Sequence, residues 1–183
     1  MKLEGITKNV YQVGNTVVDA FETILKENEK KLVQETYLVT LHRRENRDKI
    51  YLLWDQLNEI AKTTRIIYLI HPSLKKEAYK YLDEWIIKLD GVNYEDMVDI
   101  IMTSKGIITD SGGIQEEAVC AGKKVLVCRD TTERHETIEC GIGKLIDTNI
   151  MDNITFFDED LVDIINNPYG NNVCEKITSS LLL

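Results

Sequence analysis

Short apolar runs rich in β-branched residues alternate with longer amphipathic stretches along this chain, and that alternation constrains the fold most. Ile66–Ile70 is a continuous apolar run, which is typical of a strand buried on both faces. By contrast, Ile50, Leu53 and Leu57 recur at the spacing of one helical face. Strands and helices that alternate in this way predict an α/β fold of the Rossmann-like class, a parallel sheet with helices on both faces.

The same pattern locates the expected elements. Strands are expected at residues 37–41, 65–70, 86–89, 106–109, 125–128 and 144–146. Helices are expected at residues 16–31, 49–62, 74–85, 94–103, 113–121, 134–140, 159–166 and 174–182. Pro72 suits the opening of the third of these helices, and Gly122 suits the end of the fifth. The chain has 183 residues, so residues 1–183 are expected to form a single domain.

Polar residues gather directly after the expected strands. Ligands of parallel α/β sheets bind beyond the carboxyl ends of the strands, so these residues should line one rim. They are residues 42–46, His71, residues 110–113 and residues 129–134. Two of the three histidines and several arginines fall on this rim. Positive groups gathered on one rim of an acidic protein predict an anionic ligand.

Charge and cysteine usage narrow the classes of partner. The chain carries 31 acidic and 22 basic residues, a formal net charge of −9, which disfavours nucleic acid and anionic membranes as partners. No apolar run approaches the length of a bilayer span, and residues 1–5 are too short an apolar stretch for a secretion signal. The four cysteines form no Cys-x-x-Cys pair, so we expect reduced thiols, a cytoplasmic location, no metal site and no disulfide framework.

Residues 110–117, Asp-Ser-Gly-Gly-Ile-Gln-Glu-Glu, give the strongest local signal, between a strand and a helix. Gly112 and Gly113 let the backbone approach a ligand closely, and the N–H groups of a helix start suit a phosphate. Ser111 adds a hydroxyl donor, and Glu117 could accept hydrogen bonds from ribose hydroxyls. The alternative is an N-capped helix with Glu117 as solvated surface, and local chemistry leaves the two interpretations about even. Neither the Gly-x-Gly-x-x-Gly fingerprint nor a P-loop is present.

Residues 42–46, His-Arg-Arg-Glu-Asn, give the second signal. An imidazole beside two guanidiniums suits binding and proton handling at an anionic substrate. The alternative is a charged loop with a helix cap at Asn46. Because three donors stand at the carboxyl end of a strand, we favour the functional interpretation.

Residues 129–134 place Arg129 and Arg134 on either side of Asp-Thr-Thr-Glu. One interpretation is an anion clamp that faces the serine–glycine loop across the rim. The other is a polar loop that caps the next helix through Thr131 or Thr132, and local chemistry favours this second interpretation.

At these residues the chain strongly resembles the UDP-N-acetylglucosamine 2-epimerase family. The matching segments follow the family's order and are residues 14–19, 42–46, 109–118, 129–136 and 167–170. The His-Arg-Arg-Glu-Asn form looks like the non-hydrolysing branch, which interconverts UDP-N-acetylglucosamine and UDP-N-acetylmannosamine by eliminating UDP and adding it back, without a cofactor. The resemblance implies the second, UDP-binding domain of a two-domain arrangement like that of the B-type glycosyltransferases.

The resemblance also implies roles for individual residues. The implied UDP-binding residues are Ser111, Gly112, Gly113, Glu117 and Arg134. His42 is implied to be the catalytic histidine, near the leaving diphosphate. Arg43 and His71 match positions that contact a second, allosteric UDP-N-acetylglucosamine in bacterial members.

The resemblance extends to partners. The expected partners are UDP, a UDP-N-acetylhexosamine, the family's first domain in cis or in trans, and a second copy in a full-length homodimer. The family's proton-transferring carboxylates belong to that first domain, for which this chain holds no counterpart, so we expect it to be inactive alone. Two alternatives stay open: the donor domain of a UDP-sugar glycosyltransferase, and a non-catalytic nucleotide-sugar-binding fragment.

Overall fold

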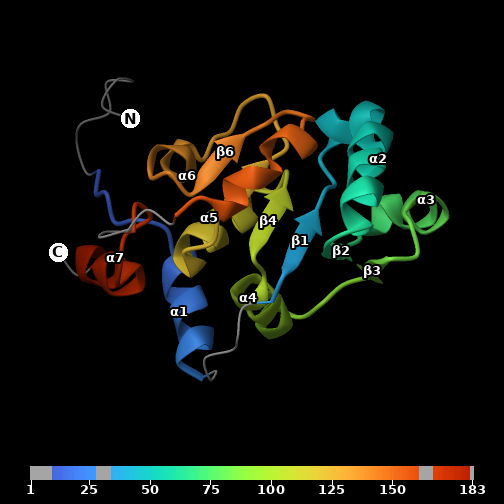
Figure 1. Cartoon of the computed structure of the whole chain (residues 1–183). Coiled ribbons are helices and arrows are strands. Elements are labelled where there is room, and N and C mark those ends of the chain that lie inside the picture. Colours follow the sequence, from blue (N-terminus) through green and yellow to red (C-terminus); the bar gives the residue numbers. More distant parts are fainter. Residues whose placement is uncertain (1–9, 28–33, 161–166, 182–183) are drawn as a thin grey trace.

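The computed structural model describes residues 10–27, 34–160 and 167–181, and a six-stranded sheet forms its centre (Figure 1). All neighbouring strands pair in parallel, in the order β3-β2-β1-β4-β5-β6. The strands are β1 (Thr36–Thr40), β2 (Arg65–Leu69), β3 (Ile86–Leu89), β4 (Gly106–Thr109), β5 (Val125–Val127) and β6 (Gly143–Leu145). The Rossmann-like parallel sheet predicted from the alternation is therefore confirmed.

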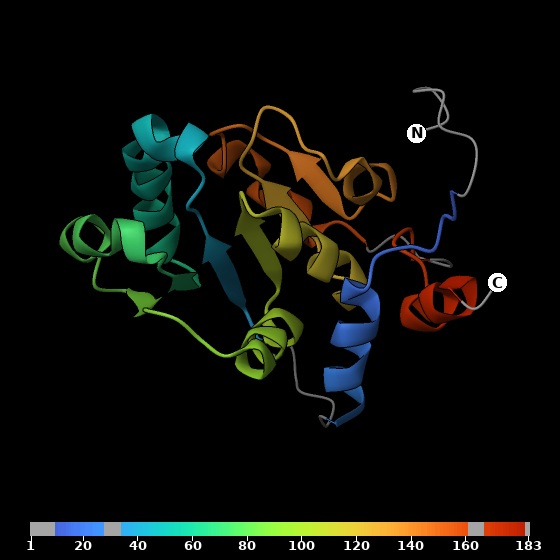
Figure 2. The same ribbon diagram turned by 180° about the vertical axis from the view of Figure 1, so that it is seen from behind.

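Helices cover both faces of the sheet, as Figures 1 and 2 show from opposite sides. One hydrophobic cluster joins the sheet to α2 and α3, and a second joins it to α1, α4 and α5. The helices are α1 (Val17–Glu27), α2 (Ile50–Ala61), α3 (Lys75–Tyr81), α4 (Tyr94–Thr103), α5 (Gly112–Ala121), α6 (His135–Glu139) and α7 (Val173–Leu181). The 3-10 helices are η2 (Arg44–Lys49), η3 (Pro72–Leu74) and η4 (Met151–Asp158). No helix in these described ranges is long and apolar enough to cross a membrane.

Strand β1 shows how the sheet separates the two clusters. All five of its residues are buried, because the strand lies at the middle of the sheet. Successive side chains of a strand point to opposite faces, so Val39 packs in the cluster with α2 and α3 while Leu38 packs in the other. Polar groups inside the first cluster are satisfied, since the Trp54 indole donates to the Tyr68 hydroxyl at 3.1 Å, which itself donates to Leu41 O at 3.2 Å.

The strand order reverses between β1 and β4, which are neighbours at the centre of the sheet. The chain leaves β1 toward β2 on one side and leaves β4 toward β5 on the other, so a crevice forms between their carboxyl ends. Residues 42–46 follow β1 and residues 110–113 follow β4. The two strongest sequence signals therefore meet at the topological switch point.

The helix predicted at 74–85 is shorter in the structure and ends at Tyr81. Beyond Tyr81, side chains form hydrogen bonds with backbone N–H groups that would otherwise have continued the helix. The Asn58 side chain accepts from the Asp83 N–H at 2.8 Å, and the Asp83 carboxylate accepts from the Trp85 N–H at 3.0 Å. Local side-chain bonds of this kind compete with the helix and turn the chain toward β3.

Two other helix predictions extend beyond the described residues. The helix predicted at 16–31 is described as far as Glu27, and residues 28–31 lie outside the described ranges. Of the helix predicted at 159–166, residues 159 and 160 are not helical, and residues 161–166 are not described. The 3-10 helix η4 just before them was not predicted.

The Gly106→Ala variant should lower the free energy of unfolding by about 1–3 kcal/mol, the usual effect of overpacking a core. A Cβ at Gly106 would overlap the ring of Phe157, which is itself buried. Gly113→Ala is the matched control, because a Cβ there meets nothing within 4 Å and alanine favours a helix over glycine. Urea unfolding of both variants tests the assignment, and equal stability of Gly106→Ala and wild type would contradict it.

Candidate functional site

The rim is organised by the carboxylate of Asp110, which is fully buried just after β4. It accepts the backbone N–H of His42 at 3.0 Å to each oxygen and that of Arg43 at 2.9 Å. It also accepts the side-chain amide of Asn46 at 2.9 Å. The loop that follows β1 is thus fastened to the loop that follows β4 by four contacts to one side chain.

Asn46 extends this network to a third strand. Its amide nitrogen donates one N–H to Asp110 and the other, at 2.8 Å, to the carbonyl of Cys128, which follows β5. Both N–H groups of the Asn46 side chain are therefore used. Asn46 is 3% exposed, so losing either bond would leave a buried polar group unpaired, at about 1–3 kcal/mol. The sequence interpretation of Asn46 as a helix cap is wrong, because Arg43 occupies the N-cap position of η2.

The two rim histidines lie against each other. The rings of His42 and His71 stack with centroids 5.1 Å apart and planes 11° from parallel. Burial lowers the pKa of His42 below its usual 6.5, and His71 and Arg43 lower it further, while Asp110 acts in the opposite direction. A pKa lowered in this way favours the neutral imidazole of His42 at pH 7.

The N-terminus of α5 is the second part of the rim. Ser111 is the N-cap residue and makes no side-chain capping bond, and its own N–H donates to the Thr109 hydroxyl at 3.0 Å. The N–H groups of Gly112 and Gly113 have no acceptor in the described part of the chain. The helix start therefore offers two backbone donors and the Ser111 hydroxyl, together with the positive end of the helix dipole.

Two guanidinium groups converge on this helix start. A Cβ added to Gly112 would lie 3.7 Å from Nη2 of Arg43 and 3.8 Å from Cζ of Arg134. A Cβ at position 112 would make ordinary van der Waals contact with both arginines, and a side chain longer than that of alanine would compete with them for this space. Two guanidiniums over the free N–H groups of a helix start make an arrangement suited to an anion with several oxygens, such as a phosphate.

Arg134 is held in place by its neighbours. Its guanidinium forms an ion pair with the buried carboxylate of Glu116 on α5. Its backbone N–H donates to the Thr132 hydroxyl at 3.0 Å, and that hydroxyl donates to Gln115 at 2.7 Å. Thr132, one of the two predicted capping residues, therefore stabilises the turn before α6, although the N-cap residue is Arg134 itself.

Arg129 is surrounded by carboxylates, whereas Arg134 lies at the start of α5. It is 7% exposed and donates to Glu45 at 2.9 Å and to Glu133 at 2.8 and 3.1 Å. All three nitrogens of its guanidinium donate to these carboxylates, so the polar-loop interpretation describes Arg129 and the anion-clamp interpretation does not.

Glu117 is not the solvated residue that one interpretation predicted. It is 8% exposed, and its carboxyl group is hydrogen-bonded to the Tyr94 hydroxyl of α4. Burial raises the pKa of Glu117 from 4.5 to about 7, with a small contribution from Glu116 and an opposing one from the bond to Tyr94. Burial likewise raises the pKa of Tyr94 to about 12.

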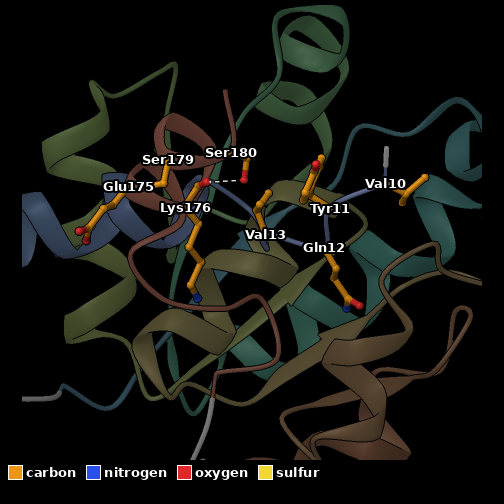
Figure 3. Close-up of a pocket in the computed structure, with 8 residues that line it drawn as sticks. All are labelled: Val10, Tyr11, Gln12, Val13, Glu175, Lys176, Ser179 and Ser180. Carbon is orange, nitrogen blue, oxygen red and sulfur yellow. Dashed lines mark hydrogen bonds between the residues drawn. The ribbon is translucent and has the colours of Figure 1, made fainter. Parts of the chain in front are cut away.

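Two cavities lie near the first described residues, and one of them adjoins the rim. A cavity of about 520 Å³ lies between residues 10–13 and α7, and Figure 3 shows its lining side chains, none of which belongs to the rim. Its one lysine, Lys176, already donates to Asn171 at 2.9 Å. A cavity of about 410 Å³ is bordered by Glu116, Arg134 and Tyr169 among others, so it adjoins the rim.

Fold and rim first define a class: a Rossmann-like α/β domain of the kind that forms half of the B-type glycosyltransferase arrangement. The model of the family described as UDP-N-acetylglucosamine 2-epimerase matches residues 1–182. The chain belongs to this family.

Individual relatives agree. The UDP-N-acetylglucosamine 2-epimerase of Campylobacter jejuni is 35% identical, over 98% of this chain and 56% of the relative, and that of Salmonella borreze is 33% identical, over 92% and 53%. The Neisseria meningitidis enzyme bound to UDP-GlcNAc superposes with a TM-score of 0.87 at 30% identity, over 99% of this chain and 57% of that one. The Methanocaldococcus jannaschii enzyme in complex with UDP-GlcNAc and UDP gives 0.81 at 31%, over 99% and 57%. The chain thus spans about half the length of the curated relatives it matches.

The buried carboxyl group of Glu117 should make the protein less stable as the pH rises from about 5 to about 7. The folded state holds the proton up to a pKa of about 7, whereas the unfolded chain releases it near 4.5. The resulting stability is complete below the lower pKa and is lost as the pH rises through the higher one, by about 2–3 kcal/mol. Glu117→Gln should remove this loss. Urea unfolding of both proteins at pH 5 and pH 8 measures it, and the same pH dependence in both would contradict the prediction.

Proposed function

We propose that this chain is the UDP-binding half of a UDP-N-acetylglucosamine 2-epimerase of the non-hydrolysing type. The observation that carries the proposal is the convergence of Arg43 and Arg134 on the uncapped start of α5, at the switch point of the sheet. Two structural relatives that contain UDP-GlcNAc, one of them with UDP as well, support the same class of ligand.

The diphosphate of UDP would lie against the start of α5. The N–H groups of Gly112 and Gly113, the Ser111 hydroxyl and the Arg134 guanidinium supply fixed donors around it. The bond between UDP and the sugar breaks with growing negative charge on the diphosphate, and donors already in place stabilise that charge without reorganisation. The absent side chain at Gly112 keeps the space open.

His42 and Glu117 have separate tasks in this proposal. His42 is the catalytic residue, a neutral imidazole that can exchange a proton next to the leaving diphosphate. Glu117 would bind the ribose hydroxyls, exchanging its bond to Tyr94 for bonds to the ligand. Because the carboxyl group is already buried, the ribose would replace one hydrogen-bond partner by another and add little desolvation.

Arg43 and His71 are the two residues proposed to contact a second, allosteric nucleotide sugar. His71 is exposed and stacks on His42, while Arg43 reaches Gly112. A second ligand bound to these two residues would therefore touch groups that border the diphosphate site. This contact gives a direct physical route by which one nucleotide sugar could alter the binding of another.

The two alternatives differ in what the full site would do. A glycosyltransferase donor domain would pass the sugar to an acceptor, whereas the epimerase returns it to UDP. A non-catalytic fragment would bind UDP and support neither reaction. We propose residues 1–183 as one domain that works with the family's first domain, in cis or in trans, in a homodimer when full-length.

Replacing Arg134 by glutamine should weaken UDP binding by about 1.5–3 kcal/mol, the usual effect of losing a hydrogen bond to a charged group. Uridine, which lacks the diphosphate, should bind equally to wild type and variant. Arg65→Gln is the matched control, since Arg65 is an exposed arginine at the amino end of β2, on the opposite edge of the sheet. Titration calorimetry measures all three proteins. An equal loss of UDP affinity in both variants would mean that the effect comes from net charge alone. It would contradict the assignment of Arg134 to the diphosphate site.

The chain alone should not turn over, because the proton-transferring carboxylates proposed for the family's first domain are not among its residues. His42 cannot replace them, since epimerisation needs proton transfer on both faces of C2. The purified chain is incubated with UDP-N-acetylglucosamine in heavy water and C2 is followed by NMR. Deuterium entering C2 at an enzymatic rate would show that the chain carries a complete site.

A further inference from the structure

The two carboxylate oxygens of Asp110 accept different numbers of hydrogen bonds. Oδ2 accepts the Arg43 N–H at 2.9 Å and the Asn46 amide at 2.9 Å, in addition to the His42 N–H at 3.0 Å. Oδ1 accepts the same His42 N–H at 3.0 Å and lies 3.5 Å from Nδ1 of the His42 ring. The side chain that faces Oδ1 is therefore the imidazole of His42.

Asp110 acts as an acceptor in each of its hydrogen bonds to backbone and amide groups. The groups it meets are two backbone N–H groups and a side-chain amide nitrogen, which can only donate. A proton on Oδ2 would face one of these donors, and a proton on Oδ1 would lie beside Nδ1 of His42, which as an imidazole nitrogen is a stronger base than a carboxylate, so the ionised carboxylate is the form that fits this network. The ionised carboxylate then presents only lone pairs to the His42 ring.

A neutral imidazole carries one proton, on Nδ1 or on Nε2. With the proton on Nδ1, the positive end of the N–H dipole lies beside the carboxylate, with 3.5 Å between Nδ1 and Oδ1, which is an electrostatic attraction rather than a hydrogen bond. With the proton on Nε2, a lone pair of the ring would face a lone pair of the carboxylate across 3.5 Å. We propose that Asp110 is a positioning residue that selects the Nδ1–H tautomer of His42 and so leaves Nε2 as the nitrogen that exchanges protons.

The neighbours of the ring fit this role. His71 stacks on one face at 5.1 Å and limits rotation about the side chain. Arg43 and His71 disfavour a second proton on the ring, whereas Asp110 would stabilise the imidazolium that forms when Nε2 takes one. The imidazolium returns to the same neutral tautomer when Nε2 gives that proton back. The reaction in which Nε2 exchanges its proton rests on the proposed function. The choice of the Nδ1–H tautomer does not depend on it.

The experiment is a long-range proton–nitrogen correlation spectrum of the uniformly ¹⁵N-labelled chain without ligand at pH 8. The chain has three histidines, so the spectrum contains few imidazole signals, and His42→Gln identifies those of His42. We expect the Nδ1–H pattern at His42, although free histidine favours Nε2–H. In Asp110→Asn the dominant tautomer should switch to Nε2–H and the pKa of His42 should fall, because the carboxylate is the neighbour that raises it.

Asp130→Asn is the matched control, because Asp130 is an exposed carboxylate of the same rim, and it should leave the His42 pattern unchanged. The Nε2–H pattern in wild type would overturn the inference, and so would an unchanged tautomer and pKa in folded Asp110→Asn. If that variant does not fold, the wild-type spectrum alone decides. Because no UDP is present, failure of UDP binding and failure of this inference are separate results.

Discussion

One buried carboxylate, that of Asp110, joins the parts of the rim on which everything else depends. It ties the loop after β1 to the loop after β4, and through Asn46 it reaches the carbonyl that follows β5. Just beneath it, the hydroxyls of Thr40 and Thr109 meet at 2.6 Å. These hydrogen bonds link the strand ends to one another, so the crevice at the switch point is organised without a ligand.

The positive groups of the rim differ in whether neighbouring carboxylates occupy them. Arg129 is neutralised by two glutamates, and Lys49 pairs with Asp147 at 2.7 Å. Arg43 and Arg134 instead converge on Gly112, although Arg134 also pairs with Glu116. In a chain of net charge −9, Arg43 and Arg134 place positive charge at the start of α5, where the helix dipole adds to it.

The fold and the position of the rim could be predicted from sequence because both follow from local patterns. Apolar runs and amphipathic stretches give the strands and helices, and strand ends give the rim. The role of Asn46 could not be predicted, because its partner Asp110 lies 64 residues away and a cap is the ordinary use of such a residue. The burial of Glu117 depends on the packing of α4, and η4 has no helical periodicity to reveal it. An acidic residue directly after a central, fully buried strand was the one local signal for Asp110.

The proposed binding of the UDP diphosphate at the start of α5 is tested most directly by the chemical shifts of backbone amides. A proton–nitrogen spectrum of the ¹⁵N-labelled chain is recorded during titration with UDP and, separately, with uridine. With UDP, the amide signals of Gly112 and Gly113 should shift strongly, because they become donors to phosphate oxygens, while Gly122 at the other end of α5 should stay in place. With uridine, neither glycine should show that shift. Saturable UDP binding that leaves Gly112 and Gly113 unmoved would contradict the account.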